Sequence, residues 1–232
     1  MSAKTKISVH HVLAASLLGL LLAGCAAPKT KLSDPPIAEI PIVYSTPISS
    51  GGAPVAKLGD RYWVMTSPFI YRIFNTQYKI TIPKGFVTDL ASVPRSLWSF
   101  GLAPHDSYMS AAIIHDYLYW DQRCSKAEAD SVLKLAMYES KVGGLQRWLV
   151  YRGVASLGRG SFDDNARRKV NGERRLLTPA YTDRIIATDM TTETTLVSVL
   201  RNAGQADTVA SDAGNTDIKE FCRVAASEIA KL

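Results

Sequence analysis

The sequence predicts an α+β fold, in which a small antiparallel β-sheet is followed by a helical hairpin or bundle and then by a helical C-terminal extension. Two observations predict it. Three short segments rich in aromatic and β-branched residues lie within residues 61–82, and turn-like residues separate them. Segments with helical caps and helical spacing of apolar residues then run to about residue 157.

The predicted strands are residues 61–66 (RYWVMT), 69–74 (FIYRIF) and 78–82 (YKITI). In the second, Tyr71 and Ile73 alternate with Arg72, which indicates a strand with one solvated face. We therefore expect a small sheet or a pair of hairpins.

A turn-rich segment, GFVTDLASVPR, follows the strands. Asp89 and Ser92 can accept hydrogen bonds from the backbone ahead of them, and Pro94 suits the first turn of a helix. We expect the next residues, SLWSF, to form a short helix.

Three longer helices are expected next. Asp106 or Ser107 caps a helix that ends near residue 120, and Ser125 with Glu128 forms a capping box. The three longer helices are expected at residues 107–120, 126–142 and 145–157. Two further helices are expected nearer the C-terminus, at residues 191–204 and 217–232.

The N-terminus predicts a bacterial lipoprotein signal. Lys4 and Lys6 precede an apolar run of about a dozen residues, which is too short to span a bilayer and long enough for the core of a signal peptide. The run ends in LLAGC, which resembles a lipobox whose cysteine, here Cys25, is acylated. An ordinary secretory signal that carries a cysteine is the alternative. By the same resemblance, Ala26 after the cysteine implies the outer membrane, with the domain facing the periplasm.

The expected organisation has four parts. They are a signal peptide at residues 1–24, a Pro-rich tether at 25–57, a core α+β domain at 58–160 and a helical C-terminal extension at 161–232.

The charge argues against nucleic-acid binding. Loss of Lys4 and Lys6 with the signal peptide lowers the formal net charge from +6 to +4, and acidic and basic residues are interspersed. A basic cluster within residues 167–175 has no interleaved aromatic residues, so we expect a solvated face and no nucleic-acid partner. The expected partner is the membrane, reached through the N-terminal lipid.

Two cysteines remain after the lipobox, Cys124 and Cys222. An oxidising envelope would allow them to pair, and a disulfide closing so long a loop would stabilise the fold by roughly 4 kcal/mol. Two buried free thiols are the alternative.

The candidate site centres on AAIIHDYLYW, where His115 and Asp116 lie among apolar and aromatic residues. A helix that is apolar on all sides is a buried helix, and an unpaired carboxylate inside it would cost several kcal/mol. Neighbours on a helix diverge by about 100°, so each side chain needs its own partner from elsewhere. Asp130 on the following antiparallel helix can reach His115, and a carboxylate on one imidazole nitrogen suits a general base. Asp89, with Asp116 and backbone carbonyls, could bind a hard cation such as calcium.

The motifs resemble a small domain of unknown function found in phages and bacteria. Its pattern is a G-F-x-T-D-x-A-S-x-P turn followed by an A-x-x-H-D-x-L-Y helix and a helix with A-D, and GFVTDLASVPR, HDYLY and KAEAD follow it over about residues 60–157. This resemblance implies no established activity.

His-Asp with a tyrosine four residues beyond the histidine is also similar to the H-D-x-x-Y helix of the secreted calcium-dependent phospholipases of class A(2). That resemblance implies His115 as the base, Asp130 as the residue that orients it, and Tyr119 at the tyrosine position of the motif. It implies Asp89, Asp116 and the Leu90 carbonyl as calcium ligands. The chain departs from that family: it lacks the paired half-cystine framework and the glycine-rich calcium loop, and the separation of 15 residues from His115 to Asp130 is short.

Two functions are therefore expected as alternatives. One is a calcium-dependent acyl-ester hydrolase acting on an envelope lipid or another ester. The other is a non-catalytic, phage- or prophage-derived envelope interaction protein with a structural His-Asp pair. The sequence contains no G-x-S-x-G, H-E-x-x-H, P-loop or dinucleotide-binding glycine motif.

Overall fold

A computed structural model describes residues 52–58, 62–90, 108–188 and 217–232 of the 232-residue chain. All of these belong to one compact unit, Ile42–Leu232. Several expectations lie outside the described residues: the signal peptide, Cys25, most of the tether, the short helix of SLWSF, the caps Asp106 and Ser107, and the helix at 191–204.

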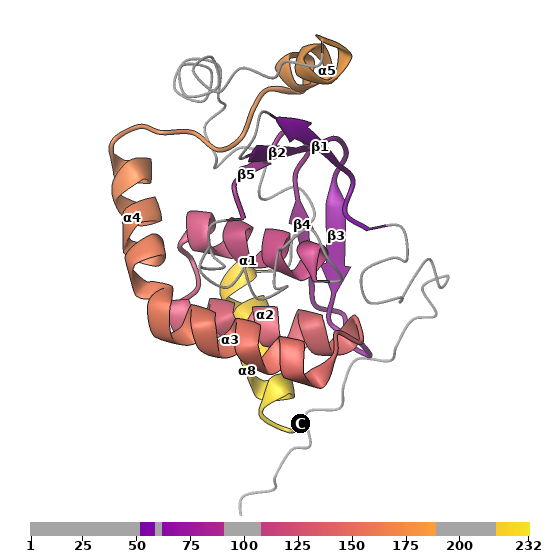
Figure 1. Cartoon of the computed structure of the whole chain (residues 1–232), viewed down its shortest axis with the longest axis vertical. Coiled ribbons are helices and arrows are strands. Elements are labelled where there is room, and N and C mark those ends of the chain that lie inside the picture. Colours follow the sequence, from indigo (N-terminus) through magenta and orange to yellow (C-terminus); the bar gives the residue numbers. More distant parts are fainter. Residues whose placement is uncertain (1–51, 59–61, 91–107, 189–216) are drawn as a thin grey trace, which may run out of the picture. The chain divides into compact units, whose positions relative to one another are not determined.

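The fold class is α+β, as predicted, with two small antiparallel sheets (Figure 1). One sheet has the strand order β1-β2-β5, and the other pairs β3 with β4. The strands are β1 (Val55–Leu58), β2 (Tyr62–Met65), β3 (Phe69–Arg72), β4 (Lys79–Ile82) and β5 (Val87–Thr88).

The first sheet begins earlier than expected. Residues 55–57, placed in the tether by the sequence, belong to β1, which pairs with β2 from Val55–Met65 to Leu58–Tyr62. The preceding residues are rich in proline, so the sequence carried no strand signal for β1, which is stabilised by pairing with β2. The tether therefore ends before Val55, and the core domain begins before residue 58.

The second sheet confirms the predicted alternation. Tyr71 is buried and Arg72 is half-buried, whereas Ile70 is 55% exposed on the opposite face. Phe69 of β3 faces Ile82 of β4 in the antiparallel register.

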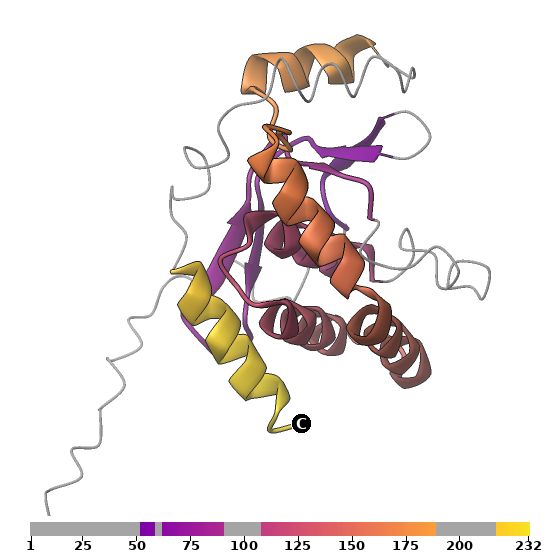
Figure 2. The ribbon, with the colours of Figure 1, turned by 90° about the vertical axis from the view of Figure 1, so that its left-hand side faces the viewer.

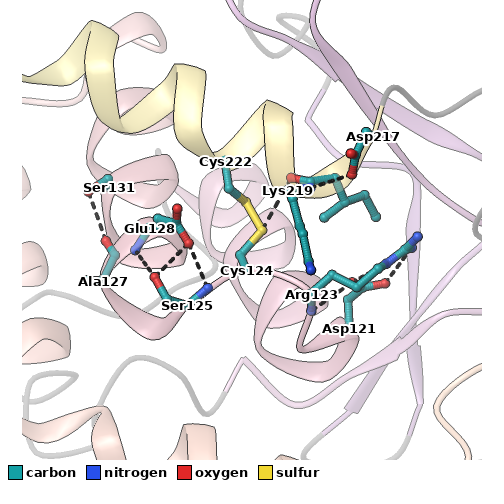
Figure 3. The surroundings of a disulfide bond; sticks show 11 residues. Asp121, Arg123, Cys124, Ser125, Ala127, Glu128, Ser131, Asp217, Lys219 and Cys222 are labelled. Carbon is teal, nitrogen blue, oxygen red and sulfur yellow. Dashed lines mark hydrogen bonds and ion pairs between the residues drawn. A yellow bond between two sulfur atoms is a disulfide. The ribbon is translucent and has the colours of Figure 1, made fainter.

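Three helices follow the sheets in the predicted order: α1 (Met109–Asp121), α2 (Lys126–Glu139) and α3 (Gly144–Leu157). Every residue of α1 from Ser110 to Trp120 is buried, because sheet and helices cover it on all sides. The capping box at the start of α2 is confirmed, since Ser125 and Glu128 bond each other's backbone N–H groups (Figure 3).

Two further helices were not predicted: α4 (Arg159–Val170) and α5 (Pro179–Thr188). The glycines at 158 and 160 indicated the end of helical structure, and α4 buries none of its residues, so its sequence carries no apolar stripe. Gly158 instead lies directly between α3 and α4. A side chain does not fit there, because a Cβ would lie 2.7 Å from the hydroxyl of Tyr119.

The last helix, α8 (Ile218–Ile229), corrects the expectation of a peripheral extension at residues 161–232. Figures 1 and 2 show it beside α2, and Phe221 and Ala225 are fully buried in the same core cluster as α1 and α2. Although α8 is far from the other helices in the sequence, it packs in the same core.

A disulfide joins Cys124, in the loop between α1 and α2, to Cys222 of α8 (Figure 3). The sequence left open whether these cysteines pair. Their separation of 98 residues gives a stabilisation of about 4.7 kcal/mol on the chain-entropy model. The bond therefore holds α8 on α2 and makes the C-terminus part of the core.

None of the helices within the described parts of the chain has the length and apolar content needed to cross a bilayer.

Candidate functional site

The two polar residues of α1 point to different partners, as their helical spacing requires. His115 is fully buried and Asp116 is 3% exposed. His115 contacts α2, whereas Asp116 contacts β5. The core therefore contains two polar clusters, one around His115 and Asp130 and the other around Asp116 and Thr88.

The first cluster centres on the carboxylate of Asp130. Its Oδ1 lies 2.9 Å from His115 Nε2 and accepts a hydrogen bond from the hydroxyl of Tyr119 at 2.7 Å. His115 and Tyr119 stand one turn apart on α1, and Asp130 stands on the first turns of α2, so the short α1–α2 connection brings all three together. The expected contact between Asp130 and His115 is thus present, while the catalytic role of these residues stays a prediction.

Lys126 completes this cluster, and the sequence analysis missed it. Its ammonium donates to Asp130 Oδ2 at 2.6 Å and to the carbonyls of Val154 and Ala155 at 3.2 Å each. Those carbonyls belong to the last turn of α3, where a cation is favoured by the helix dipole. The i, i+4 spacing of Lys126 and Asp130 is the signal that could have found this pair.

The charges set the protonation states. Burial alone would raise the pKa of Asp130, but hydrogen bonds from His115, Lys126 and Tyr119 outweigh it, so this pKa lies below its ordinary value. Burial, and then the negative charge of Asp130, raises the pKa of Tyr119. Asp130 is therefore an anion and Tyr119 a neutral donor at neutral pH.

One nitrogen of His115 remains unused. Asp130 is an acceptor only, so Nε2 must carry the proton in their hydrogen bond. The other ring nitrogen, Nδ1, is buried and finds no hydrogen-bond partner within the described residues. A buried polar atom without a partner costs about 1–3 kcal/mol, and such atoms are rare in native proteins.

Close packing fixes the orientation of these rings. The ring centroids of His115 and Tyr119 lie 4.0 Å apart, and Phe162 of α4 packs edge-on against Tyr119 at 5.1 Å. Gly158 adjoins the Tyr119 hydroxyl, where any larger residue would collide with it. The site thus draws on α1, α2, α3 and α4.

The second cluster surrounds Asp116. Thr88 of β5 donates its hydroxyl hydrogen to Asp116 Oδ2 at 2.5 Å, and the same hydroxyl oxygen accepts from the N–H of Leu90 at 3.1 Å. Leu90 is buried and adopts a positive φ of 52°, which turns the chain sharply after β5. No pattern in the sequence indicated this role of Thr88.

Arg175 supplies the positive charge of this second cluster. It is only 4% exposed, its Nη1 lies 3.5 Å from Asp89 Oδ1, and its guanidinium lies over the ring of Trp120 at 5.3 Å. Burial alone would lower the pKa of Arg175, but the nearby charges of Asp89 and Asp116 outweigh it and raise this pKa. The sequence analysis placed Arg175 in a solvated basic face, and this residue is corrected to a buried partner of Asp89.

Arg175 is the cation that the structure places beside Asp89. Calcium takes six to eight oxygen ligands, chiefly carboxylates and carbonyls. Within the described ranges, no three His, Cys, Asp or Glu side chains gather closely enough to hold a metal. Asp116 is engaged by Thr88, and Asp89 by Arg175. Calcium binding by Asp89, Leu90 and Asp116 stays a prediction.

The comparisons with known proteins identify a class of domain. Residues 63–154 match the family described as "Protein of unknown function (DUF1353)". No curated protein and no solved structure matches the chain.

A DUF1353 domain is thus found at residues 63–154, from within β2 to the last turn of α3, and it includes His115, Asp116 and Asp130. This agrees with the predicted domain of unknown function at about residues 60–157. The likeness to phospholipases is not tested by these comparisons and stays a hypothesis.

Substitution of Asp130 by Asn should reduce the dependence of stability on acid. The pKa of Asp130 is lowered on folding, so its contribution is present above about pH 4 and is lost as the pH falls further. The wild-type free energy of unfolding should therefore decrease between pH 7 and pH 3 by more than that of Asp130→Asn. Urea unfolding followed by circular dichroism measures both.

Asp183→Asn is the matched control, because Asp183 pairs with Lys84 but is 63% exposed. Its acid dependence should equal that of the wild type. If Asp130→Asn loses as much stability in acid as the wild type, the hydrogen bonds of His115, Tyr119 and Lys126 to Asp130 do not stabilise the fold as proposed.

Proposed function

We propose that the mature protein is a lipid-anchored protein of the bacterial envelope whose domain hydrolyses acyl esters with His115 as the general base. The observation that carries the proposal is the Nδ1 of His115, which has no hydrogen-bond partner within the described residues, on a ring whose Nε2 is held by Asp130. A buried imidazole with one nitrogen fixed by a carboxylate and the other free is suited to take a proton from water.

The proposed reaction uses one water molecule and one ester. His115 Nδ1 accepts a proton from the water as its oxygen forms a bond to the ester carbonyl carbon. The negative charge of Asp130 stabilises the imidazolium that results. The carbon–oxygen bond to the alcohol then breaks, and Nδ1 returns the proton to the departing alkoxide, so the products are a carboxylic acid and an alcohol.

The arrangement of α1 and α2 supports this chemistry through the resemblance to phospholipases of class A(2). That resemblance expects a histidine base, a tyrosine one turn later and an aspartate on the next antiparallel helix. His115, Tyr119 and Asp130 meet in this way, with both α1 side chains bonded to the same carboxylate oxygen.

A non-catalytic interaction protein is the second candidate. It is favoured by the burial of His115, which has no exposed surface, and by Lys126, which already neutralises Asp130. In this alternative the cluster only joins α1, α2 and α3, and the motifs suggest a phage or prophage origin.

His115→Gln should separate the two candidates. A glutamine amide can still donate to Asp130 but offers no basic nitrogen, so the fold should be kept while hydrolysis falls by about 10²- to 10⁴-fold. Release of nitrophenol from p-nitrophenyl butyrate and of fatty acid from phosphatidylglycerol vesicles measures the activity, and thermal unfolding checks the fold.

The same assays run with calcium chloride and with a chelator test the calcium hypothesis, and calorimetric titration of wild type and Asp116→Asn measures calcium binding directly. Equal rates for wild type and His115→Gln, or no hydrolysis by the wild type under either condition, would contradict the hydrolase and leave the interaction protein.

The envelope location is supported by the lipobox and by the disulfide between Cys124 and Cys222, since disulfides persist in oxidising compartments. Cys25→Ser should abolish acylation and move the protein from the membrane fraction to the soluble periplasmic fraction. Fractionation of cells followed by immunoblotting measures this.

Metabolic labelling with radioactive palmitate provides the control, because wild type should incorporate label and Cys25→Ser should not. Label in the Cys25→Ser protein would contradict lipidation at this cysteine.

A further inference from the structure

We infer that the outward face of α3 is a docking surface for an anionic phospholipid bilayer. We define this α3 surface as Leu145, Trp148, Leu149 and Arg152. The inference rests on the proposed function only for the nearness of a membrane, and it assigns the domain an orientation on that membrane that neither the lipobox nor the His115 site requires.

The α3 surface is unusual because large apolar side chains face solvent. Leu145 is 73% exposed and Trp148 is 58% exposed, and Leu149, directly after Trp148, is partly exposed. Only Val150 and Val154 of this helix are buried. Figure 1 shows α3 along the outside of the described helices, with its other side against α2. Leu149 packs partly against the core, whereas most of the Leu145 and Trp148 side chains faces solvent.

Their spacing puts them on one side of the helix. Positions 145, 148, 149 and 152 recur at intervals of three and four, which is the repeat of a single helical face. A tryptophan with a leucine one turn away forms an apolar strip that can enter the boundary between headgroups and acyl chains. Tryptophan is enriched at this depth in membrane proteins.

The charge of the helix selects an anionic surface. The sequence of α3, GLQRWLVYRGVASL, contains two arginines and no acidic residue. Arg152 lies on the exposed face, and Lys141 is exposed in the turn that leads into the helix. Basic residues near an anionic leaflet contribute about 1 kcal/mol each. Exposed apolar residues rimmed by cations thus match an anionic bilayer better than a second copy of this basic chain.

The α3 surface would also orient the domain, which a lipid anchor at the end of a long tether would otherwise leave free to rotate at the membrane. A second, weak attachment becomes effectively intramolecular once the first has formed, so even modest affinity orients the domain.

The test uses the mature chain from residue 25 to 232 with Cys25→Ser, so that no acyl chain contributes. Sedimentation with vesicles of phosphatidylcholine, with and without phosphatidylglycerol, measures the partition coefficient. We expect binding to the phosphatidylglycerol vesicles, and a reduction of about tenfold or more for Leu145→Ser combined with Trp148→Ser. Arg152→Gln should weaken binding to anionic vesicles and flatten its dependence on salt.

Ile70→Ser combined with Phe74→Ser is the matched control, since these side chains are 55% and 51% exposed on the β3–β4 hairpin. This control should bind as the unsubstituted chain does, and circular dichroism should show equal folding of all variants. Equal loss in the control pair and the α3 pair would indicate general adhesion and overturn the inference.

Three further outcomes would overturn it: no binding to anionic vesicles, binding that survives the α3 substitutions, or a dimer that these substitutions dissociate without any vesicle binding. Hydrolysis of the soluble p-nitrophenyl ester is measured in parallel. Because that assay needs no membrane, hydrolysis by the unsubstituted chain without any vesicle binding refutes the docking surface alone, and vesicle binding without hydrolysis refutes the proposed enzyme alone.

Discussion

The packing of the helices in this domain depends on the hydrogen bonds to the Asp130 carboxylate. It receives hydrogen bonds from His115 and Tyr119 of α1 and from Lys126 of α2, and Lys126 also binds the carbonyls at the end of α3. Removing one partner of a buried charge typically costs about 3–5 kcal/mol, because the remaining charge is left without compensation. A single anion therefore fixes the relative positions of three helices.

This anion also explains why α1 can be buried on every side. A helix with ionisable residues in a dry core is stable only when each has its own partner. His115 is bound by α2, and Asp116 is bound by Thr88 next to the buried Arg175. Each cluster contains its own cation: Lys126 lies beside Asp130, and Arg175 lies beside Asp89 near Asp116.

Local signals in the sequence predicted much of this arrangement. The capping box at Ser125 placed α2, and the short connection after α1 placed Asp130 beside His115. The sequence could not place Arg175, because its contact with Asp89 spans 86 residues. It could not indicate that α8 enters the core, since that depends on the disulfide and on a partner face of α2 far away in sequence.

The tautomer of His115 tests the account most directly. Nitrogen-15 NMR of the imidazole rings at pH 7, with His105→Ala to assign the signals, reports which nitrogen carries the proton. The account predicts a neutral ring protonated at Nε2, with Nδ1 bare and available as a base. A proton on Nδ1, alone or together with one on Nε2, would contradict it, because His115 would then have no free basic nitrogen.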